Sequence, residues 1–165
     1  MRCQIKNRKS KELKNNMEVI FEVPGQPKGK ERPRWTMVSN TSIVYTPRNT
    51  RGYEDMIKTY YKINNFKAFK KDEALEVSAI AYYQIPKNTK KSHKLLMLKG
   101  EMLPTKKPDI DNILKIVLDA LNGVAYSDDS QVCKVNFIKM YSENPRLKVL
   151  IRNIGEKFDE NIQDI

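Results

Sequence analysis

The sequence predicts a single mixed α+β domain, in which a small mixed β-sheet is flanked by helices. Two observations predict this class. Short apolar or β-branched runs that end at prolines or turns alternate with helical patterns. The length of 165 residues suits one domain and is enough for a hydrophobic core. We expect the domain at residues 18 to 153, between a basic tail at 1 to 17 and an acidic tail at 154 to 165.

The first half of the predicted domain contains two strands and a helix. Residues 18 to 23 (EVIFEV) have a strand pattern that stops at Pro24, and residues 41 to 46 (TSIVYT) are short, β-branched and bounded by turns. From about Thr50 onward, apolar residues recur at helical spacing on one face, at Tyr53, Ile57 and Tyr60 or Tyr61.

The second half begins with the strongest strand signal, a mostly apolar run at residues 74 to 86. Residues 89 to 100 are compatible with another short helix. The runs SQVCKVNFIKMY and RLKVLIRNI predict a closing hairpin around the turn SENP. Between these elements, an i, i+3, i+4, i+7 apolar pattern predicts a helix that packs one face on the core and stops at Asn122 and Gly123; its apolar positions are Ile110, Ile113, Leu114, Val117, Leu118 and Leu121.

The net charge is +11, from 31 Lys and Arg against 20 Asp and Glu, and it favours a polyanionic partner such as a phosphate backbone. The basic residues form three clusters: the first seventeen residues, the segment PKGKERPRW and the segment PKNTKKSHK. The second is expected to be a loop, because its prolines and glycines disfavour helix and sheet. Solubilising surface charge is the alternative for each cluster. The expected DNA-binding residues are Lys28, Lys30, Arg32 and Arg34.

Several classes of protein and site are disfavoured. No apolar run approaches the roughly 20 residues of a membrane helix, and the N-terminus lacks the apolar region of a signal peptide, so we expect a cytoplasmic protein with no membrane partner. Cys3 and Cys133 suit a reducing compartment better than a disulfide framework. His93 is the only histidine, which argues against zinc, and we expect it to be solvated.

Five carboxylates gather in the stretch KKPDIDNILKIVLDALNGVAYSDDSQV of this basic chain. Asp109 and Asp111 lie at the start of the predicted helix, and Asp128 and Asp129 follow it at the mouth of the next strand. If that strand runs back alongside the helix, the second pair is expected to approach the first. Asp119, one turn further along the helix, is expected to be structural or solvated.

A structural explanation accounts for only part of this acidic group. Aspartates at a helix start gain about 0.3 to 1 kcal/mol each from the exposed N–H groups, which explains one or two of them. Like charges about 4 Å apart repel by roughly 4 kcal/mol at an effective dielectric of 20, so a cluster needs a cation. Mg²⁺, or Mn²⁺ in its place, is the natural candidate for oxygen ligands. An EF-hand is a poor alternative because its required glycine would be Leu114.

At these residues the sequence resembles a known family. KPDIDNILKIVLDALNG followed by YSDDSQV resembles the signature of the RusA family of Holliday junction resolvases, and VPGQPKGKERPRW and YTPRNTRGYED resemble its N-terminal region. The likeness covers about residues 19 to 152. It implies an α/β homodimer that cleaves four-way DNA junctions with Mg²⁺ at one acidic site per subunit. By motif position it implies metal-binding Asp109, Asp111 and Asp129, a neighbouring Asp128 and an active-site Lys115.

The reaction expected from these residues is metal-dependent phosphodiester hydrolysis. Metal held by the aspartates activates a water molecule, and Lys115 adds positive charge near the scissile phosphate. The alternative for Lys115 is a simple i, i+4 partner of Asp111. Paired cleavage of a four-way junction calls for two sites, hence a C₂ homodimer. The aromatic segment KTYYKINNF is a weak candidate for the interface.

Two other classes of function stay open. A non-catalytic DNA-binding protein explains the charge, and Trp35, Tyr45 and Tyr53 are candidates for base contacts, but that class leaves the carboxylates unexplained. A metal-dependent phosphohydrolase on a smaller substrate, such as a nucleotide, explains the acids but not three basic clusters. Cleavage of branched DNA with Mg²⁺ but not with EDTA, and competition between junction DNA and mononucleotides, separate these classes.

Overall fold

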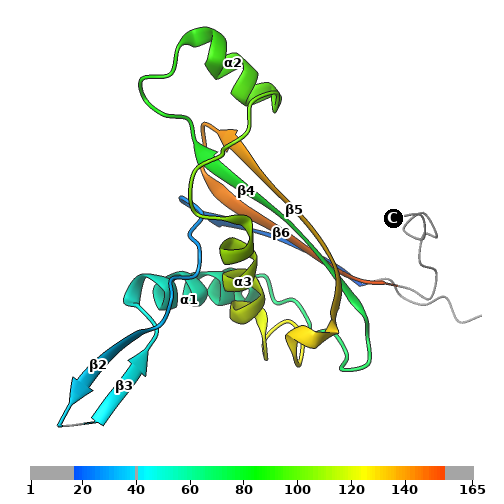
Figure 1. The fold of residues 1–165 in the computed structure, drawn as a ribbon. Helices are drawn as coiled ribbons and strands as arrows, with labels where there is room; N and C mark the ends of the chain where they lie inside the picture. The colour runs from blue at the N-terminus through cyan, green and yellow to red at the C-terminus, as the bar shows by residue number, and fades with distance from the viewer. Residues whose placement is uncertain (1–16, 40, 155–165) are drawn as a thin grey trace, which may run out of the picture.

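The structure is a computed structural model that describes residues 17–39 and 41–154. Its main element is a four-stranded mixed sheet in the order β1-β6-β4-β5 (Figure 1). Strand β4 pairs parallel with β5 and antiparallel with β6, and β6 pairs antiparallel with β1. The strands are β1 (Glu18–Pro24), β4 (Leu75–Gln84), β5 (Val132–Ser142) and β6 (Arg146–Asn153). The predicted mixed α+β fold is confirmed. Of the two predicted tails, only Met17 and Ile154 fall within the described residues.

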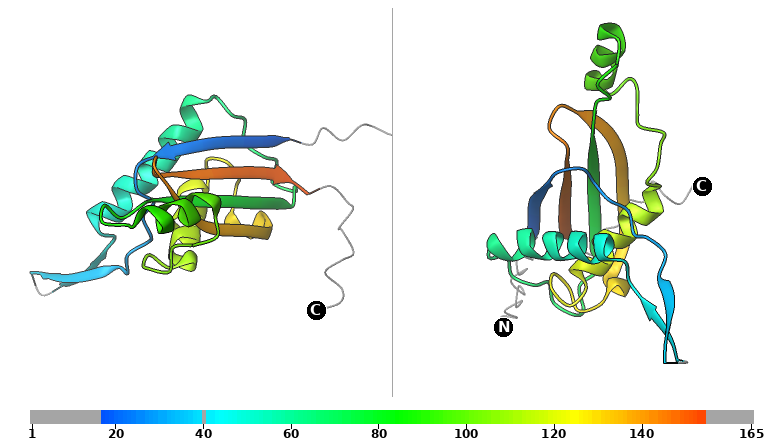
Figure 2. Two further views of the ribbon diagram at one scale, coloured as in Figure 1. Left: turned by 90° about the horizontal axis from the view of Figure 1, so that it is seen from above. Right: turned by 90° about the vertical axis from the view of Figure 1, so that its left-hand side faces the viewer.

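Within residues 17–39 and 41–154, three α-helices complete the domain: α1 (Arg48–Ile63), α2 (Lys91–Lys99) and α3 (Ile110–Leu121). Helices α1 and α3 pack together on one face of the sheet, while α2 lies beyond one end of it (Figure 2). A single 3₁₀ turn, η1 (Asp129–Gln131), precedes β5. Each of the three predicted helices is therefore present, and α3 spans the residues that its apolar spacing indicated.

The core lies between the sheet and these two helices. Alternate residues of the central strands point into it, such as Val77 and Ala79 of β4 and Val149 of β6. Helix α3 contributes five fully buried side chains: Ile113, Ile116, Val117, Ala120 and Leu121. Full burial of one large apolar side chain is worth about 1.5 to 3 kcal/mol. Helix α3 is thus firmly anchored, and so is any site at its ends.

The predicted closing hairpin is wrong in its pairing. Strands β5 and β6 are consecutive in the chain, but β4 lies between them and pairs with both. The apolar composition of β4 explains this arrangement, because a strand buried on its helix-facing side and paired on both edges belongs at the centre of a sheet.

A second, two-stranded sheet is formed by β2 (Arg34–Val38) and β3 (Thr41–Tyr45) and is called the β2–β3 hairpin below. It projects away from the domain beyond the start of α1 (Figure 1). The sequence predicted β3 but placed Arg34 in a loop, and the structure makes Arg34 the first residue of β2, opposite Tyr45. The proline-rich segment ends at Pro33, so the chain is free to pair immediately afterwards.

His93 is exposed on α2, as expected from the sequence, and Cys133 of β5 is an exposed free thiol. Within residues 17–39 and 41–154, no helix has both the length and the apolar character needed to cross a bilayer.

Candidate active site at the start of helix α3

The two aspartates at the start of α3 are exposed. Asp109 is the N-cap residue, but its side chain makes no capping hydrogen bond. Asp111 lies in the first turn, where its only hydrogen bond to another described residue is a long one, 3.5 Å, from the side-chain amide of its neighbour Asn112. Helix capping therefore does not account for Asp109, and both carboxylates are available to a ligand.

A buried lysine holds the chain immediately before Asp109. Lys139 of β5 is only 8% exposed, and its ammonium donates hydrogen bonds to the carbonyl oxygens of Lys106 (2.6 Å) and Pro108 (3.0 Å). Sequence analysis missed this residue. A signal was present, because Lys139 continues the alternation of Val135 and Phe137 on the helix-facing side of β5. A lysine in such a register needs a buried acceptor.

The basic loop, residues 27 to 33, lies against the same helix start. The Lys30 amide donates to the carbonyl oxygen of Asn112 (2.8 Å). A Cβ atom on Gly29 would be 2.7 Å from Cβ of Pro108 and 3.1 Å from Cβ of Asn112, so glycine is required for this close approach. The contact leaves a cavity of about 430 Å³ lined by Gly29, Lys30, Glu31, Lys107, Pro108, Asp109 and Asn112. Asp109 therefore faces a space rimmed by basic residues.

The four predicted DNA-binding residues differ in their surroundings. Lys30 is paired with Asp119 and with Glu54 (3.3 Å), and its side chain is only 22% exposed. Partial burial alone lowers the pKa of Lys30, but the hydrogen bonds and charges of Asp119 and Glu54 outweigh it and raise that pKa. Lys28, Arg32 and Arg34 are exposed. Asp119 thus has the structural role expected of it, and Lys30 is committed to that ion pair.

The second acidic pair lies in the η1 turn, and its two members differ. Asp128 caps this turn by accepting a hydrogen bond from the Ser130 amide (2.9 Å), while the Gln131 side chain accepts from the amides of Ser127 and Asp128. The bond to Ser130 lowers the pKa of Asp128. Asp129 is exposed and its side chain makes no hydrogen bond or ion pair within the described part of the chain.

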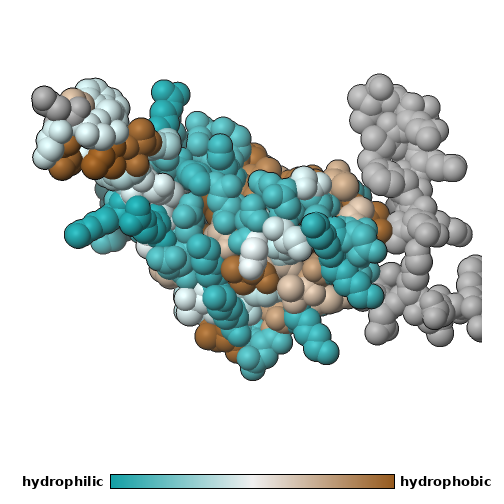
Figure 3. Space-filling model, turned by 90° about the horizontal axis from the view of Figure 1, so that it is seen from below, coloured by the Kyte–Doolittle hydropathy of each residue, from teal (hydrophilic) through white to brown (hydrophobic). Residues whose placement is uncertain are grey.

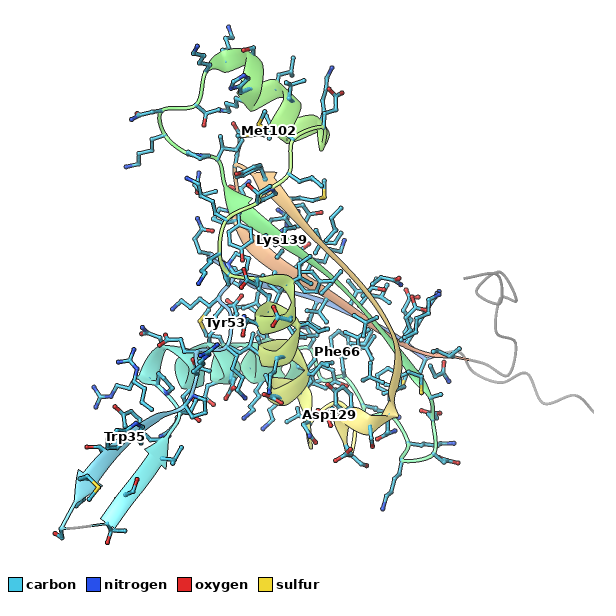
Figure 4. The ribbon with its side chains drawn as sticks, viewed as in Figure 1. Trp35, Tyr53, Phe66, Met102, Asp129 and Lys139 are labelled. Carbon is cyan, nitrogen blue, oxygen red and sulfur yellow. The ribbon has the colours of Figure 1, made fainter. Side chains whose placement is uncertain are left out.

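The two acidic pairs lie at opposite ends of α3, so the expected approach of one to the other is wrong. Strand β5 begins near the C-terminal end of α3 and reaches the helix start only at Lys139 (Figure 4). Twelve helical residues span about 18 Å, far beyond the separation of ligands on one metal ion. Within residues 17–39 and 41–154, no three His, Cys, Asp or Glu side chains are grouped to hold a metal. Strand β5 does run back alongside α3, but Asp128 and Asp129 come before this strand and so stay near the C-terminal end of the helix.

One chain therefore offers Asp109 and Asp111 as a two-carboxylate site. Mg²⁺ is commonly held by one or two carboxylates together with waters and substrate phosphate oxygens, so this pair fits such an ion only in company with other ligands. Lys115 is exposed one turn beyond Asp111 and forms no ion pair with it among the described residues, so it is available to an anionic ligand.

Comparisons with known proteins match most of the chain. Residues 24–152 match the family model described as Endodeoxyribonuclease RusA. The chain is also 32% identical over 139 residues to the uncharacterized protein YqaN of Bacillus subtilis (strain 168), an alignment that covers 83% of this chain and 97% of that protein. The family match includes the basic loop, the β2–β3 hairpin, both acidic pairs and β5.

Proposed function

This chain belongs to the RusA family of endodeoxyribonucleases, and we propose that it resolves four-way DNA junctions by Mg²⁺-dependent hydrolysis of phosphodiester bonds. The observation that carries the proposal is the pair of unengaged carboxylates, Asp109 and Asp111, beside a basic loop on a protein of charge +11. The positive surface attracts DNA, and the carboxylates are suited to a cation between them and the phosphate.

Each side chain has a distinct part in this reaction. Asp109 and Asp111 would hold the ion, which supplies an activated water and neutralises charge on the phosphodiester. Lys115 lies on the same exposed side of the helix start and stabilises negative charge on the phosphate. Lys28 and Arg32 contact the flanking backbone, while Lys30 keeps the basic loop in place through Asp119.

In this proposal, each active site takes its Asp129 from a second copy of the chain. It follows the C-terminal end of α3, whose twelve residues span about 18 Å, whereas Asp109 precedes the helix, so the two do not share an ion in one chain. Two α3 helices packed antiparallel about a two-fold axis would place Asp129 of the partner subunit at the start of the helix. Apolar side chains that the domain covers only in part lie along this helix and the neighbouring strand: Ile110 is exposed and Leu114 half-buried on α3, and Val135 is exposed on the helix-facing side of β5.

This surface replaces the aromatic segment KTYYKINNF as the candidate interface. Tyr61 in that segment is buried, and Tyr60 and Phe66 pack against the core, so these aromatic side chains are already used within the domain. Ile110 and Val135 are instead exposed, and β5 is an edge strand of 11 residues. A long uncovered edge favours pairing with another chain. A homodimer also supplies the two sites that paired cleavage requires.

Incubation of the purified protein with a labelled four-way junction tests this function. With Mg²⁺ we expect symmetric nicks that yield two duplexes, and with EDTA no cleavage but retained binding. Binding without cleavage under any divalent ion would favour a non-catalytic DNA-binding protein. Competition by mononucleotides as effective as that by junction DNA would favour a phosphohydrolase on small substrates.

A further inference from the structure

The β2–β3 hairpin exposes more apolar side chains than its surroundings explain. Its described residues are all exposed, including Trp35 (71%), Val44 (68%) and Met37 (56%). Trp35 lies directly opposite Val44 in the pairing, and Met37 is two residues along, so these three share one face. Figure 3 shows hydrophobic side chains gathered on this projecting element, apart from the hydrophilic surface beside it.

In this region the charged residues lie at the base of the hairpin, and no charged residue follows Arg34 within its two strands. The sequence from residue 32 to residue 53 contains four arginines and no Asp or Glu. Three of these arginines, Arg34, Arg48 and Arg51, line a cleft of about 520 Å³ at the base of the hairpin, where Glu31 accepts a hydrogen bond from Arg34 (3.3 Å). From residue 35 to residue 47 the sequence has no charged residue. The cleft at the base is therefore suited to phosphate, and the uncharged strands beyond Arg34 are suited to an apolar partner.

We propose that the β2–β3 hairpin inserts its Trp35, Met37 and Val44 face among the unstacked bases at the centre of branched DNA, while the arginines at its base hold the adjacent phosphates. This inference rests on the proposed function. A two-stranded ribbon fits a DNA groove, and apolar side chains wedge between base steps or stack on splayed bases.

The dimensions of the hairpin agree with this role. Five strand residues extend about 17 Å, whereas the DNA grooves are about 7.5 to 8.5 Å deep. Met37 lies three residues, about 10 Å, beyond Arg34, so this face extends from the phosphate backbone to the depth of the bases, and Trp35, one residue beyond Arg34, would meet the first splayed base. An intact duplex offers no unstacked base, so the hairpin selects for branch points, where stacking is already interrupted.

Charge complementarity favours DNA over a second copy of this chain on the hairpin. Two hairpins packed face to face would bring together two segments that each carry four arginines without a carboxylate. DNA supplies the opposite charge at the base of the hairpin and aromatic bases along its strands. A second copy is nevertheless a distinct outcome of the experiment.

Trp35 is the only tryptophan in the chain, so tryptophan fluorescence, excited at a wavelength that tyrosine does not absorb, reports on the hairpin alone. The parental protein is titrated in EDTA with a four-way junction and with a fully paired duplex of the same composition. We expect solvent-exposed emission that is independent of protein concentration, and quenching by the junction well beyond that by the duplex. Concentration-dependent, blue-shifted emission without DNA would overturn the inference in favour of a second copy. Emission unchanged at saturating junction would also overturn it.

Base unstacking is measured with 2-aminopurine placed at the branch point. The parental protein should raise its fluorescence, Trp35→Ala should abolish the rise and weaken junction binding by about fivefold or more, and Trp35→Phe should restore most of both. Ile63→Ala is the matched control, because Ile63 is a 62% exposed apolar residue on α1, and it should behave as the parental protein. Equal unstacking by Trp35→Ala and the parental protein would overturn the inference.

Parallel cleavage assays with Mg²⁺ separate the two hypotheses. If the parental protein cleaves junctions but Trp35→Ala unstacks them normally, the hairpin inference fails and the proposed nuclease function stands. If the parental protein unstacks the branch point through Trp35 but cleaves nothing with any divalent ion, the proposed function fails and the hairpin inference stands.

Discussion

Asp109 and Asp111 are the residues whose chemistry can be tested most directly. Asparagine is nearly isosteric with aspartate but neutral, so Asp109→Asn or Asp111→Asn should abolish cleavage and leave junction binding unchanged or tighter. Single-turnover cleavage and gel-shift titration measure the two effects. Asp128→Asn is the matched control and should be mild, because asparagine also caps a helical turn well. Full activity in either Asp109→Asn or Asp111→Asn would exclude that residue from the site.

Lys139 gives a prediction about positioning. Lys139→Met keeps the apolar stem but removes the donor from the carbonyl oxygens of Lys106 and Pro108, which should cost about 1 to 3 kcal/mol of stability. Because this segment leads into Asp109, the Mg²⁺ concentration for half-maximal cleavage should also rise. Lys148→Met on β6 is the control. An unchanged Mg²⁺ dependence in a folded Lys139→Met protein would restrict Lys139 to a purely structural role.

Glu76 predicts a pH dependence of stability. It is buried, and it accepts hydrogen bonds from Arg152 (2.8 and 3.1 Å) and Asn136 (2.7 Å). Burial alone raises the pKa of Glu76, but the bonds and charge of Arg152 outweigh it and lower that pKa. The stabilisation is therefore complete above the unfolded pKa of about 4.3 and is lost as the pH falls through the lower folded pKa.

Glu76→Gln should accordingly reduce the free energy of unfolding at pH 7 by about 1 to 2 kcal/mol, a modest loss because Arg152 is 48% exposed and solvent screens its charge. Urea titrations at neutral and acidic pH measure the difference between the variant and the parental protein. That difference should shrink as the solution is acidified. A difference that is constant with pH would mean that packing, not ionisation, is responsible.

At the scale of elements, apolar spacing predicted α3 from Ile110 to Leu121 because one face of the helix is buried along its whole length. Spacing carried no information about which end of α3 would lie near Asp129, since that depends on where β5 enters the sheet. The pairing of β5 and β6 was predicted wrongly for a related reason: β4 competes for both as partners. Local patterns predicted the elements, and long-range pairing decided how they meet.

Alanine is expected to have opposite effects at two glycines: at Gly29, which lies in the close contact of the basic loop with α3, and at Gly52 of α1, which has open space around it. Gly29→Ala places a Cβ atom 2.7 Å from the Pro108 ring, so it should lower the melting temperature and weaken DNA binding. Gly52 lies within α1 with no atom within 4 Å of an added Cβ, so Gly52→Ala should stabilise the protein by about 0.5 to 1 kcal/mol. Thermal unfolding and gel shifts test both variants. Equal stability of the two would contradict the close approach at Gly29.

At the scale of the whole molecule, the proposed shared site predicts complementation between inactive variants. Asp109→Asn and Asp129→Asn proteins should each be inactive alone. In a mixture that exchanges subunits, one site of each heterodimer combines an intact Asp109 with an intact Asp129, so nicking should return to about one quarter of the parental level. Nicking of a labelled junction measures the recovery. If each site belonged to one chain, the mixture would stay inactive.

The position of β6 has a consequence for how the protein is made. Among the described strands, β1 pairs only with β6, so the first strand of the sheet to be synthesised has its partner in the last one. Residues 18–24 therefore leave the ribosome with no sheet partner until residues 146–153 follow. Closing so long a loop is slow, and unpaired strands are exposed meanwhile. A nascent chain that stalls before β6 lacks the link between β1 and β4. We therefore expect translation products that end before β6 to be recognised by chaperones and degraded faster than the complete chain.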